Sequence, residues 1–203
     1  MLQAFTVEES TLVLLKKLEE IPLFENLRLV GGTSLALQLG HRHSIDLDLF
    51  GDITATHNEI YDELIKRGFD VYSRHITPRI HVFNINGVKV DIVNYPYKWI
   101  EPALETENIR LASLKDIVPM KLEAITNRGA KKDFIDIYFL LQHFSLKQML
   151  KFYEMKYTKG SPFNVMRSLS YFEDAEEELM PKMFVPVEWE NIKLTIKTAI
   201  EQF

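Results

Sequence analysis

The chain has 203 residues, of which 46% are hydrophobic and 26% are charged, and its formal net charge is −5. This composition is typical of a globular protein with a buried core, arranged as one domain or two small ones. The acidic balance excludes a bulk polycation, so contact with nucleic acid needs a local basic patch. The absence of cysteine excludes disulfides, thiol catalysis and cysteine-ligated zinc.

The sequence shows no sign of export or of a membrane anchor. Residues 1–10 lack both the basic region and the apolar region of a secretory signal. No apolar run approaches the roughly 20 residues that span a bilayer. We therefore expect a cytoplasmic protein with no membrane partner.

Hydrophobic periodicity predicts alternating helices and strands in the first 100 residues. The expected helices cover residues 11–20, 33–40 and 54–67, the second capped by Thr33 or Ser34. The expected strands cover residues 27–30, 44–50 and 69–72. A hairpin is expected where Asn86-Gly87 separates two alternating apolar runs, residues 81–85 and 88–93.

The pattern changes after Pro96, and from about Leu111 only helical periodicity is visible. Helices are expected at residues 113–118, 119–127, 132–143, 146–157 and 187–202, with a further one starting near residue 161. The second of these begins at Pro119, because proline suits the first position of a helix. The predicted fold class is α/β (α+β). A mixed, partly antiparallel sheet in residues 1–100 precedes a C-terminal helical domain in residues 101–203.

The segment Asp46-Leu47-Asp48 is the first candidate for chemistry. In a strand, alternate side chains share a face, so the two carboxylates point the same way and Leu47 points into the core. Carboxylate oxygens suit Mg²⁺ or Mn²⁺ better than zinc. The alternative is a half-exposed strand whose outer face is acidic.

A glycine turn, Gly31-Gly32-Thr33-Ser34, lies between a predicted strand and a predicted helix. Glycine lets the backbone approach a ligand closely, and a helix N-terminus offers N–H groups to a phosphate. The turn matches neither the P-loop nor the dinucleotide fingerprint, and alone it could be an ordinary connection. Together with the two aspartates it forms a candidate site for a nucleoside triphosphate (NTP) and its metals.

Asp91 lies in the otherwise apolar strand at residues 88–93. A carboxylate there is costly unless it is paired or bound to metal, although a backbone amide at the strand end could also satisfy it. Three strand carboxylates behind a glycine turn are what two-metal nucleotidyl transfer requires.

These residues carry a resemblance to a known family. The Gly-Gly-Thr-Ser turn followed by the segment Arg42-His43-Ser44-Ile45-Asp46-Leu47-Asp48 resembles the nucleotidyltransferase superfamily, and more narrowly the AbiEii/AbiGii toxins of abortive-infection and toxin–antitoxin systems. The likeness extends from about residue 25 to residue 195. It includes the helical segments 112–117, 120–125, 128–129, 132–138 and 171–176.

The resemblance implies roles for matching residues. The nucleotide-binding set would be Gly31, Gly32, Thr33, Ser34, Arg42 and Ser44, with Arg42 and Ser44 either touching substrate or bracing the turn. The metal ligands would be Asp46, Asp48 and Asp91. The catalytic set would be Asp46, Asp48, Lys121, Asp133 and Asp136, with Lys121 reaching the triphosphate.

The helical residues also have plainer interpretations. Lys121 could be the polar edge of a core-facing helix, and Asp133 and Asp136, which share a helix face, could belong to an ion-paired surface.

The expected function is transfer of a nucleoside monophosphate from an NTP to an acceptor hydroxyl, with Mg²⁺ or Mn²⁺ and an active site between the two halves. By resemblance, the chain would be the toxin of a toxin–antitoxin or phage-defence pair with a cognate antitoxin. The acceptor could be tRNA or another RNA, contacted by a basic run, Arg110, Lys115, Lys121, Arg128, Lys131 and Lys132. The alternatives are transfer to a small molecule or protein, and an inactive nucleotide-binding or partner-binding domain.

Overall fold

The computed structural model describes all 203 residues. The chain forms two compact units. The first unit holds residues 1–38, 44–96 and 103–112, and the second holds residues 39–43, 97–102 and 113–203. The sequence predicts one boundary near residue 100, whereas the units alternate along the chain: residues 39–43 and 97–102 belong with the C-terminal helices, and residues 103–112 belong with the first unit. No helix is long and apolar enough to cross a membrane.

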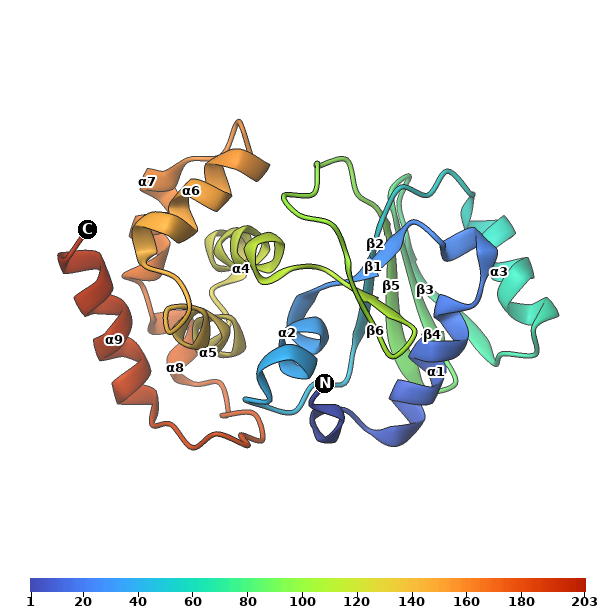
Figure 1. Cartoon of the computed structure of the whole chain (residues 1–203), viewed down its shortest axis with the longest axis horizontal. Helices are drawn as coiled ribbons and strands as arrows, with labels where there is room; N and C mark the ends of the chain where they lie inside the picture. The colour runs from blue at the N-terminus through green and yellow to red at the C-terminus, as the bar shows by residue number, and fades with distance from the viewer. The chain divides into compact units, whose positions relative to one another are not determined.

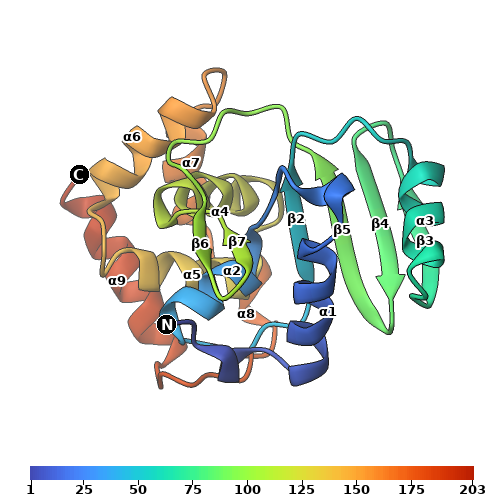
Figure 2. The same ribbon diagram turned by 45° about the vertical axis from the view of Figure 1, so that its right-hand side comes forward.

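The first unit is built on a seven-stranded sheet with the order β3-β4-β5-β2-β1-β7-β6. Figure 1 labels the elements, and Figure 2 shows β2, β5 and β4 side by side. The strands are β1 Leu27–Leu29, β2 Leu47–Gly51, β3 Val71–Ile76, β4 Ile80–Ile85, β5 Val88–Asn94, β6 Leu104–Thr106 and β7 Ile109–Leu111. The predicted mixed sheet is confirmed, since β2 runs parallel to β5 and antiparallel to β1.

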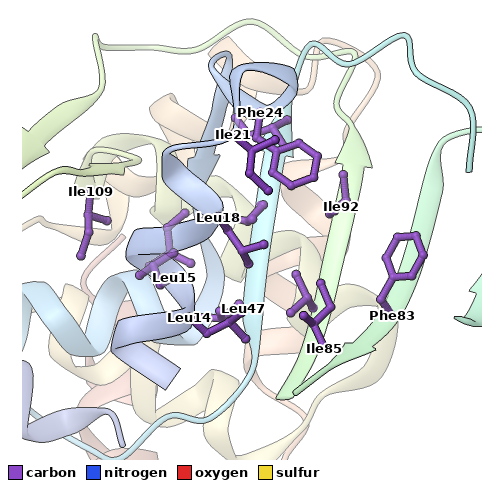
Figure 3. Packing of buried hydrophobic residues seen from close by; sticks show 14 of the residues in the cluster. Leu14, Leu15, Leu18, Ile21, Phe24, Leu47, Phe83, Ile85, Ile92 and Ile109 are labelled. Carbon is purple, nitrogen blue, oxygen red and sulfur yellow. The ribbon is translucent and has the colours of Figure 1, made fainter. Parts of the chain in front are cut away.

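The helices of the first unit bury one face of this sheet. They are η1 Ala4–Thr6, α1 Glu9–Glu19, η2 Pro22–Phe24, α2 Gly31–Leu39 and α3 His57–Lys66. Figure 3 shows Leu14, Leu15 and Leu18 of α1 among the side chains of the strands, including Leu47 and Ile92. Burial of these side chains drives the assembly, at about 25 cal/mol per Å² of apolar surface.

Turn chemistry explains one confirmed hairpin and one that the sequence analysis missed. Asn86 and Gly87 have φ of 51° and 86°, the conformation that joins β4 to β5 as predicted. The β6–β7 hairpin turns at Glu107 and Asn108, whose φ angles of 52° and 62° are also positive. The second turn contains no glycine and its strands have three residues each, so neither the turn nor the periodicity predicts it.

The second unit consists of helices and the two short segments. Its helices are α4 Leu114–Arg128, α5 Lys131–Leu140, α6 Leu146–Lys156, α7 Pro162–Leu169, α8 Glu173–Glu176 and α9 Trp189–Glu201. The predicted break at Pro119 is wrong, since α4 continues through it. A proline removes one helical hydrogen bond, and burial of Val118, Leu122 and Ile125 outweighs that loss.

Each short segment is tied to the rest of the second unit by specific contacts. His43 donates its backbone N–H to the carbonyl of Lys182, and Phe184 donates to the carbonyl of His41. In the other segment, Ile100 and Glu101 donate backbone N–H groups to the carboxylate of Asp116, at 2.8 and 3.1 Å. These contacts make residues 39–43 and 97–102 structural parts of the helical unit.

Candidate active site

Asp48 and Asp91 lie side by side in the first unit. Their strands are parallel neighbours, and the two residues are direct partners in the register. Adjacent strands are about 4.8 Å apart, so the two carboxylates project together from the same face. Leu47 and Leu49 point into the core on the other face. The predicted alternation around Asp48 is confirmed.

The glycine turn is expected to bring the backbone close to a ligand. In the structure, Gly31 lies close to the carboxylate of Asp48, an aspartate of the chain itself. Its φ is +68°, and a Cβ atom built on it would overlap Oδ2 of Asp48. Any side chain at this position would therefore displace the carboxylate. The helix α2 begins at Gly31 itself, not after a cap at Thr33 or Ser34 as predicted. The N–H groups of its first turn lack partners within the helix, which is the property expected of an anion site.

Two hydroxyl side chains connect α2 to the segment that carries the aspartates. The hydroxyls of Thr33 and Ser44 share a hydrogen bond of 2.8 Å, and Thr33 also donates to the backbone carbonyl of Asp46. Ser34 is buried and its hydroxyl accepts from Gln38 at 3.2 Å. Strand β2 starts at Leu47, so the predicted strand from residue 44 is too long. These hydrogen bonds hold Asp46 in place just ahead of the strand.

A lysine that the sequence analysis did not single out lies among the carboxylates. The Nζ atom of Lys89 is 2.8 Å from both carboxylate oxygens of Asp91. Burial lowers the pKa of Lys89, but the hydrogen bond and charge of Asp91, with the charges of Asp48 and Asp46, raise it overall. Because all three carboxylates act on this one ammonium group, they form a single acidic cluster. Residues 89 and 91 are two positions apart on a predicted strand and therefore share a face. This spacing is the signal in the sequence that could have identified the pair.

The donor atoms of this cluster fit a hard divalent cation. They are carboxylate oxygens, which Mg²⁺ and Mn²⁺ prefer, and both Asp46 and Asp48 are only partly buried. No group of three or more acidic or histidine side chains is positioned to hold a metal alone. Magnesium sites that use one or two carboxylates complete their coordination with water and substrate phosphates. Asp46 and Asp48 suit such a site.

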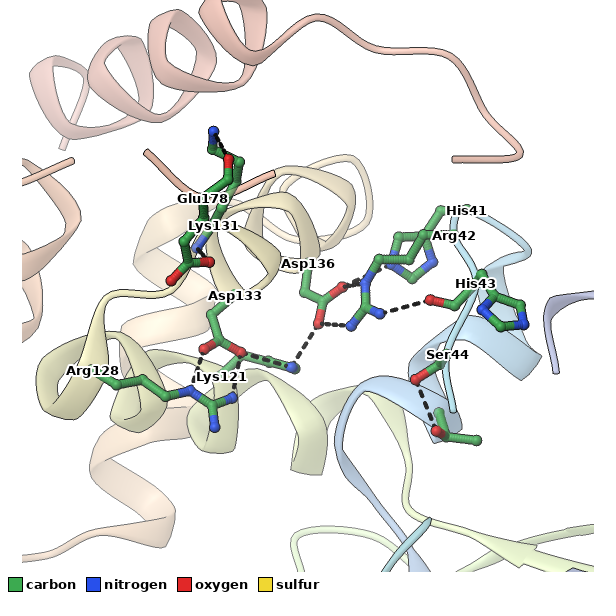
Figure 4. Close-up of polar contacts among 11 residues, drawn as sticks. His41, Arg42, His43, Ser44, Lys121, Arg128, Lys131, Asp133, Asp136 and Glu178 are labelled. Carbon is green, nitrogen blue, oxygen red and sulfur yellow. Dashed lines mark hydrogen bonds and ion pairs between the residues drawn. The ribbon is translucent and has the colours of Figure 1, made fainter. Parts of the chain in front are cut away.

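The second unit encloses a charged cluster around Asp136, which is fully buried (Figure 4). Arg42 donates to both carboxylate oxygens, each at 2.8 Å, and His41 Nε2 is 2.8 Å from Oδ1. Lys121 Nζ lies 2.6 Å from Oδ2. Burial raises the pKa of Asp136, but the charges of Arg42 and Lys121 hold it well below its usual range.

Asp133 extends the same cluster by one helical turn. It accepts from Lys121 at 2.9 Å and from Arg128 at 2.6 and 3.0 Å. The prediction that Asp133 and Asp136 share a helix face is confirmed, because both contact Lys121. Burial lowers the pKa of Lys121, and the two aspartates raise it overall, so the ammonium stays charged. Lys121, Asp133, Asp136 and Arg42 therefore gather in one buried network, while the aspartates of the sheet lie in the other unit.

The predicted basic run does not form a surface. Arg110 pairs with Glu19 at 2.5 Å and donates to backbone carbonyls, and Lys115 pairs with Glu101 at 2.6 Å. Lys121 and Lys131 are buried. The run fails because its members lie on different elements and most of them neutralise acids of the chain.

A polar groove of about 900 Å³ is present in the second unit instead. Its lining includes Arg128, Lys159, Arg167 and Tyr171. The Arg128 side chain is 54% exposed although Asp133 anchors it, and Tyr171 is 48% exposed. The loop before α7 is shaped by Gly160, where a Cβ atom would overlap the Tyr153 ring. Three exposed cations therefore line this groove, and Asp133 holds one of them, Arg128, in place; the lining also contains two acids, Glu123 and Asp174.

Comparison with known proteins identifies the family of the chain. The sequence profile of the family described as "Nucleotidyl transferase AbiEii toxin, Type IV TA system" matches residues 13–199. A protein of Aquifex aeolicus, aq_aa25, is 31% identical over 197 residues, which is 93% of each chain.

Solved structures show the same fold at low sequence identity. JHP933 from Helicobacter pylori superposes with a TM-score of 0.63 at 16% identity, covering 97% of this chain and 92% of that one. The nucleotidyltransferase toxin MenT4 from Mycobacterium tuberculosis has a TM-score of 0.54 at 13% identity, covering 96% and 82% of the two chains.

The mixed sheet and the family match define the class of this protein as a nucleotidyltransferase. Within that class, the chain belongs to the AbiEii toxin family of type IV toxin–antitoxin systems.

Proposed function

We propose that the first unit performs divalent-cation-dependent transfer of a nucleoside monophosphate from an NTP to an acceptor hydroxyl. The observation that supports this most is the in-register pair of Asp48 and Asp91, with Gly31 against the Asp48 carboxylate. In this proposal Asp46 and Asp48 hold Mg²⁺ or Mn²⁺. The bound cation would supply a Lewis acid for the phosphate oxygens and for the acceptor hydroxyl.

The backbone around Gly31 and Gly32 would bind the triphosphate through the N–H groups of the first turn of α2. Thr33 and Ser44 would act by positioning, because their hydroxyls hold the segment that carries Asp46. With the NTP so oriented, the acceptor oxygen attacks the α-phosphorus, the bond to the bridging oxygen breaks and pyrophosphate leaves.

We assign the residues of the buried network a positioning role within the second unit. Asp136 and Asp133 would hold Arg42, Lys121 and Arg128 in fixed positions. Of these cations, Arg128 has an exposed side chain (54%) that a phosphate group of a ligand can reach, whereas Arg42 and Lys121 are buried.

For the acceptor we favour an RNA strand, tRNA included, because of the polar groove in the second unit. Arg128, Lys159 and Arg167 offer contacts to phosphodiester groups, and the ring of Tyr171 offers a surface on which a base can stack. Membership in a type IV toxin–antitoxin family also supports a cognate antitoxin as protein partner.

The test is a transfer assay with each NTP labelled at the α-phosphate, Mg²⁺, and total tRNA or no acceptor. The wild type should label RNA, and Asp48→Asn should lower the rate by about 100-fold or more while the protein still folds. Asp52→Asn, at an exposed position just after β2, serves as the matched control and should retain activity. An unchanged rate in Asp48→Asn would refute the site, and label on protein or small molecules alone would refute the RNA acceptor.

A further inference from the structure

An acidic side chain, Glu123 of α4, lies in the polar groove of the second unit among cations that suit phosphate groups. It lines the groove together with Arg128, Lys159 and Arg167. A phosphodiester group is attracted by the three cations and repelled by the carboxylate. A ligand that fills this groove therefore needs a second kind of group, one that a carboxylate binds.

The Glu123 carboxylate is held in place by neighbouring donors. The Tyr153 hydroxyl donates to Oε2 at 2.7 Å, and the Asn127 amide donates to Oε1 at 3.5 Å. Tyr153 is only 3% exposed, and Gly160 packs so closely against it that a Cβ atom there would overlap the ring and the hydroxyl. Burial and the hydrogen bond to Glu123 raise the pKa of Tyr153, so the hydroxyl stays protonated and keeps donating.

Glu123 retains acceptor capacity toward the groove. A carboxylate offers about four lone-pair sites, and its hydrogen bonds to Tyr153 and Asn127 use two of them. The side chain is half-buried, so a ligand in the groove can reach the remaining sites. An ordered acceptor selects N–H donors and rejects carbonyl oxygens, because two acceptors placed together leave each other unsatisfied.

The bases of RNA differ in what they offer to such an acceptor. Cytosine and adenine carry an exocyclic amino group, whereas uracil carries the O4 carbonyl. Uracil has one ring N–H on the same edge, flanked by two carbonyl oxygens that a carboxylate repels. These edges are accessible only in unpaired nucleotides, whose phosphates can contact Lys159 and Arg167 while the base stacks on Tyr171.

We propose that the groove binds an unpaired RNA nucleotide whose base carries an exocyclic amino group, with Glu123 accepting a hydrogen bond from that group. This inference rests on the proposed RNA acceptor and specifies which bases the acceptor presents to the second unit. Glu123 is then the residue that determines specificity in the groove. Tyr153 is a positioning residue that acts through Glu123.

The experiment compares cytidine and uridine homo-oligonucleotides of equal length, because their bases have the same ring size and opposite groups at position 4. Fluorescence anisotropy with the full chain, at one fixed salt concentration, gives the ratio of the two dissociation constants. Wild type should bind the cytidine oligonucleotide at least about 10-fold more tightly, which is the effect of one hydrogen bond to a charged group.

Glu123→Gln should abolish or invert this preference. The Tyr153 hydroxyl would hold the amide oxygen of the glutamine, so the amide N–H groups would face the groove and donate to O4 of uracil. The uridine oligonucleotide should therefore bind more tightly than it does to wild type. Glu154→Gln, which removes an exposed acid of α6 outside the groove lining, is the matched control and should keep the wild-type ratio.

Tyr153→Phe tests the positioning role, because it keeps the ring and removes only the hydroxyl. The ratio should fall between those of wild type and Glu123→Gln, since the released carboxylate can turn away from the base. Equal affinities of wild type for the two oligonucleotides would overturn the proposal. A wild-type ratio in Glu123→Gln would also overturn it or, if that variant does not fold, a wild-type ratio in Tyr153→Phe. If neither oligonucleotide binds, the inference fails, and the transfer assay with total tRNA shows separately whether the proposed function fails with it.

Discussion

Gly31 satisfies two separate requirements at one position. Its φ of +68° lies in the left-handed region, and its missing Cβ leaves room for the Asp48 carboxylate. A left-handed conformation costs an L-residue about 1–2 kcal/mol, and that cost does not depend on the neighbours. The overlap with Asp48, by contrast, is specific to the site.

Gly31→Ala should therefore lower both stability and transfer, and a second glycine separates the two effects. Gly68 has φ of +81°, and no atom lies within 4 Å of the place that a Cβ would occupy, so Gly68→Ala carries only the backbone cost. Both variants should lose about 1–2 kcal/mol in urea unfolding. Only Gly31→Ala should also lose activity, by at least about 10-fold, which corresponds to roughly 1.4 kcal/mol. Equal activity in the two variants would show that Asp48 does not need its present position.

At the scale of elements, the contact between α4 and α5 depends on buried charge. Asp136 of α5 has no exposed surface and is contacted by Arg42 and Lys121. Removing one partner from a buried ion pair typically costs about 3–5 kcal/mol, because the remaining charges lose their compensation.

Asp136→Asn should reduce the free energy of unfolding of the second unit by about 3–5 kcal/mol at pH 7. Both tryptophans, Trp99 and Trp189, lie in that unit, so their fluorescence reports its unfolding. The pKa of Asp136 is held well below its usual range in the folded protein. The carboxylate therefore contributes fully to the free energy of unfolding above about pH 4, and this contribution is lost as the pH falls further. The difference in the free energy of unfolding between Asp136→Asn and wild type should therefore decrease as the pH falls below about 4. Glu63→Gln, in an exposed pair with Arg67, should cost less than about 1 kcal/mol.

The groove beside α7 gives a second prediction at this scale. Each lost contact between a cation and a phosphate lowers the slope of log K against log salt by about 0.7 for single strands. Lys159→Ala combined with Arg167→Ala should therefore weaken binding of a labelled single-stranded RNA and reduce that slope by about 1.4. The control combines Lys132→Ala with Lys151→Ala, which remove two exposed lysines outside the groove lining. It should change log K for the RNA and the slope of log K against log salt by no more than a few tenths. Equal slopes in the two double variants would remove the groove from the RNA proposal.

At the scale of the whole molecule, neither unit corresponds to a continuous stretch of chain. The helices of residues 113–203 supply only part of what compensates two of their buried aspartates: Lys121 pairs with Asp136 and Lys156 with Asp116, and the remaining partners lie outside these helices. Arg42 and His41 supply the other partners of Asp136, and residues 100–101 supply backbone donors to Asp116.

A fragment of residues 101–203 should consequently fail to fold cooperatively. Its circular dichroism should show reduced helix content and a broad thermal transition, whereas a fragment of such size with a complete core would unfold sharply. A sharp transition in the fragment would mean that residues 39–43 and 97–102 contribute little to the second unit.

The sequence predicts local features well and long-range pairing poorly. The turn at Asn86-Gly87 and the alternation around Asp48 depend only on neighbouring residues, and both are confirmed. The course of α4 through Pro119 depends on which side chains are buried around it, which periodicity alone does not reveal. The partnership of Arg42 with Asp136 joins residues 94 positions apart, and no local pattern indicates it.

That separation has a consequence for the order of events during synthesis. At about 5–20 residues per second, the ribosome completes Asp136 roughly 5 to 20 s after Arg42. Throughout this interval the nascent chain carries an arginine whose buried partner does not yet exist. The second unit can close only after most of the polypeptide has emerged, so a ribosome that stalls before α5 leaves a product without the helical unit.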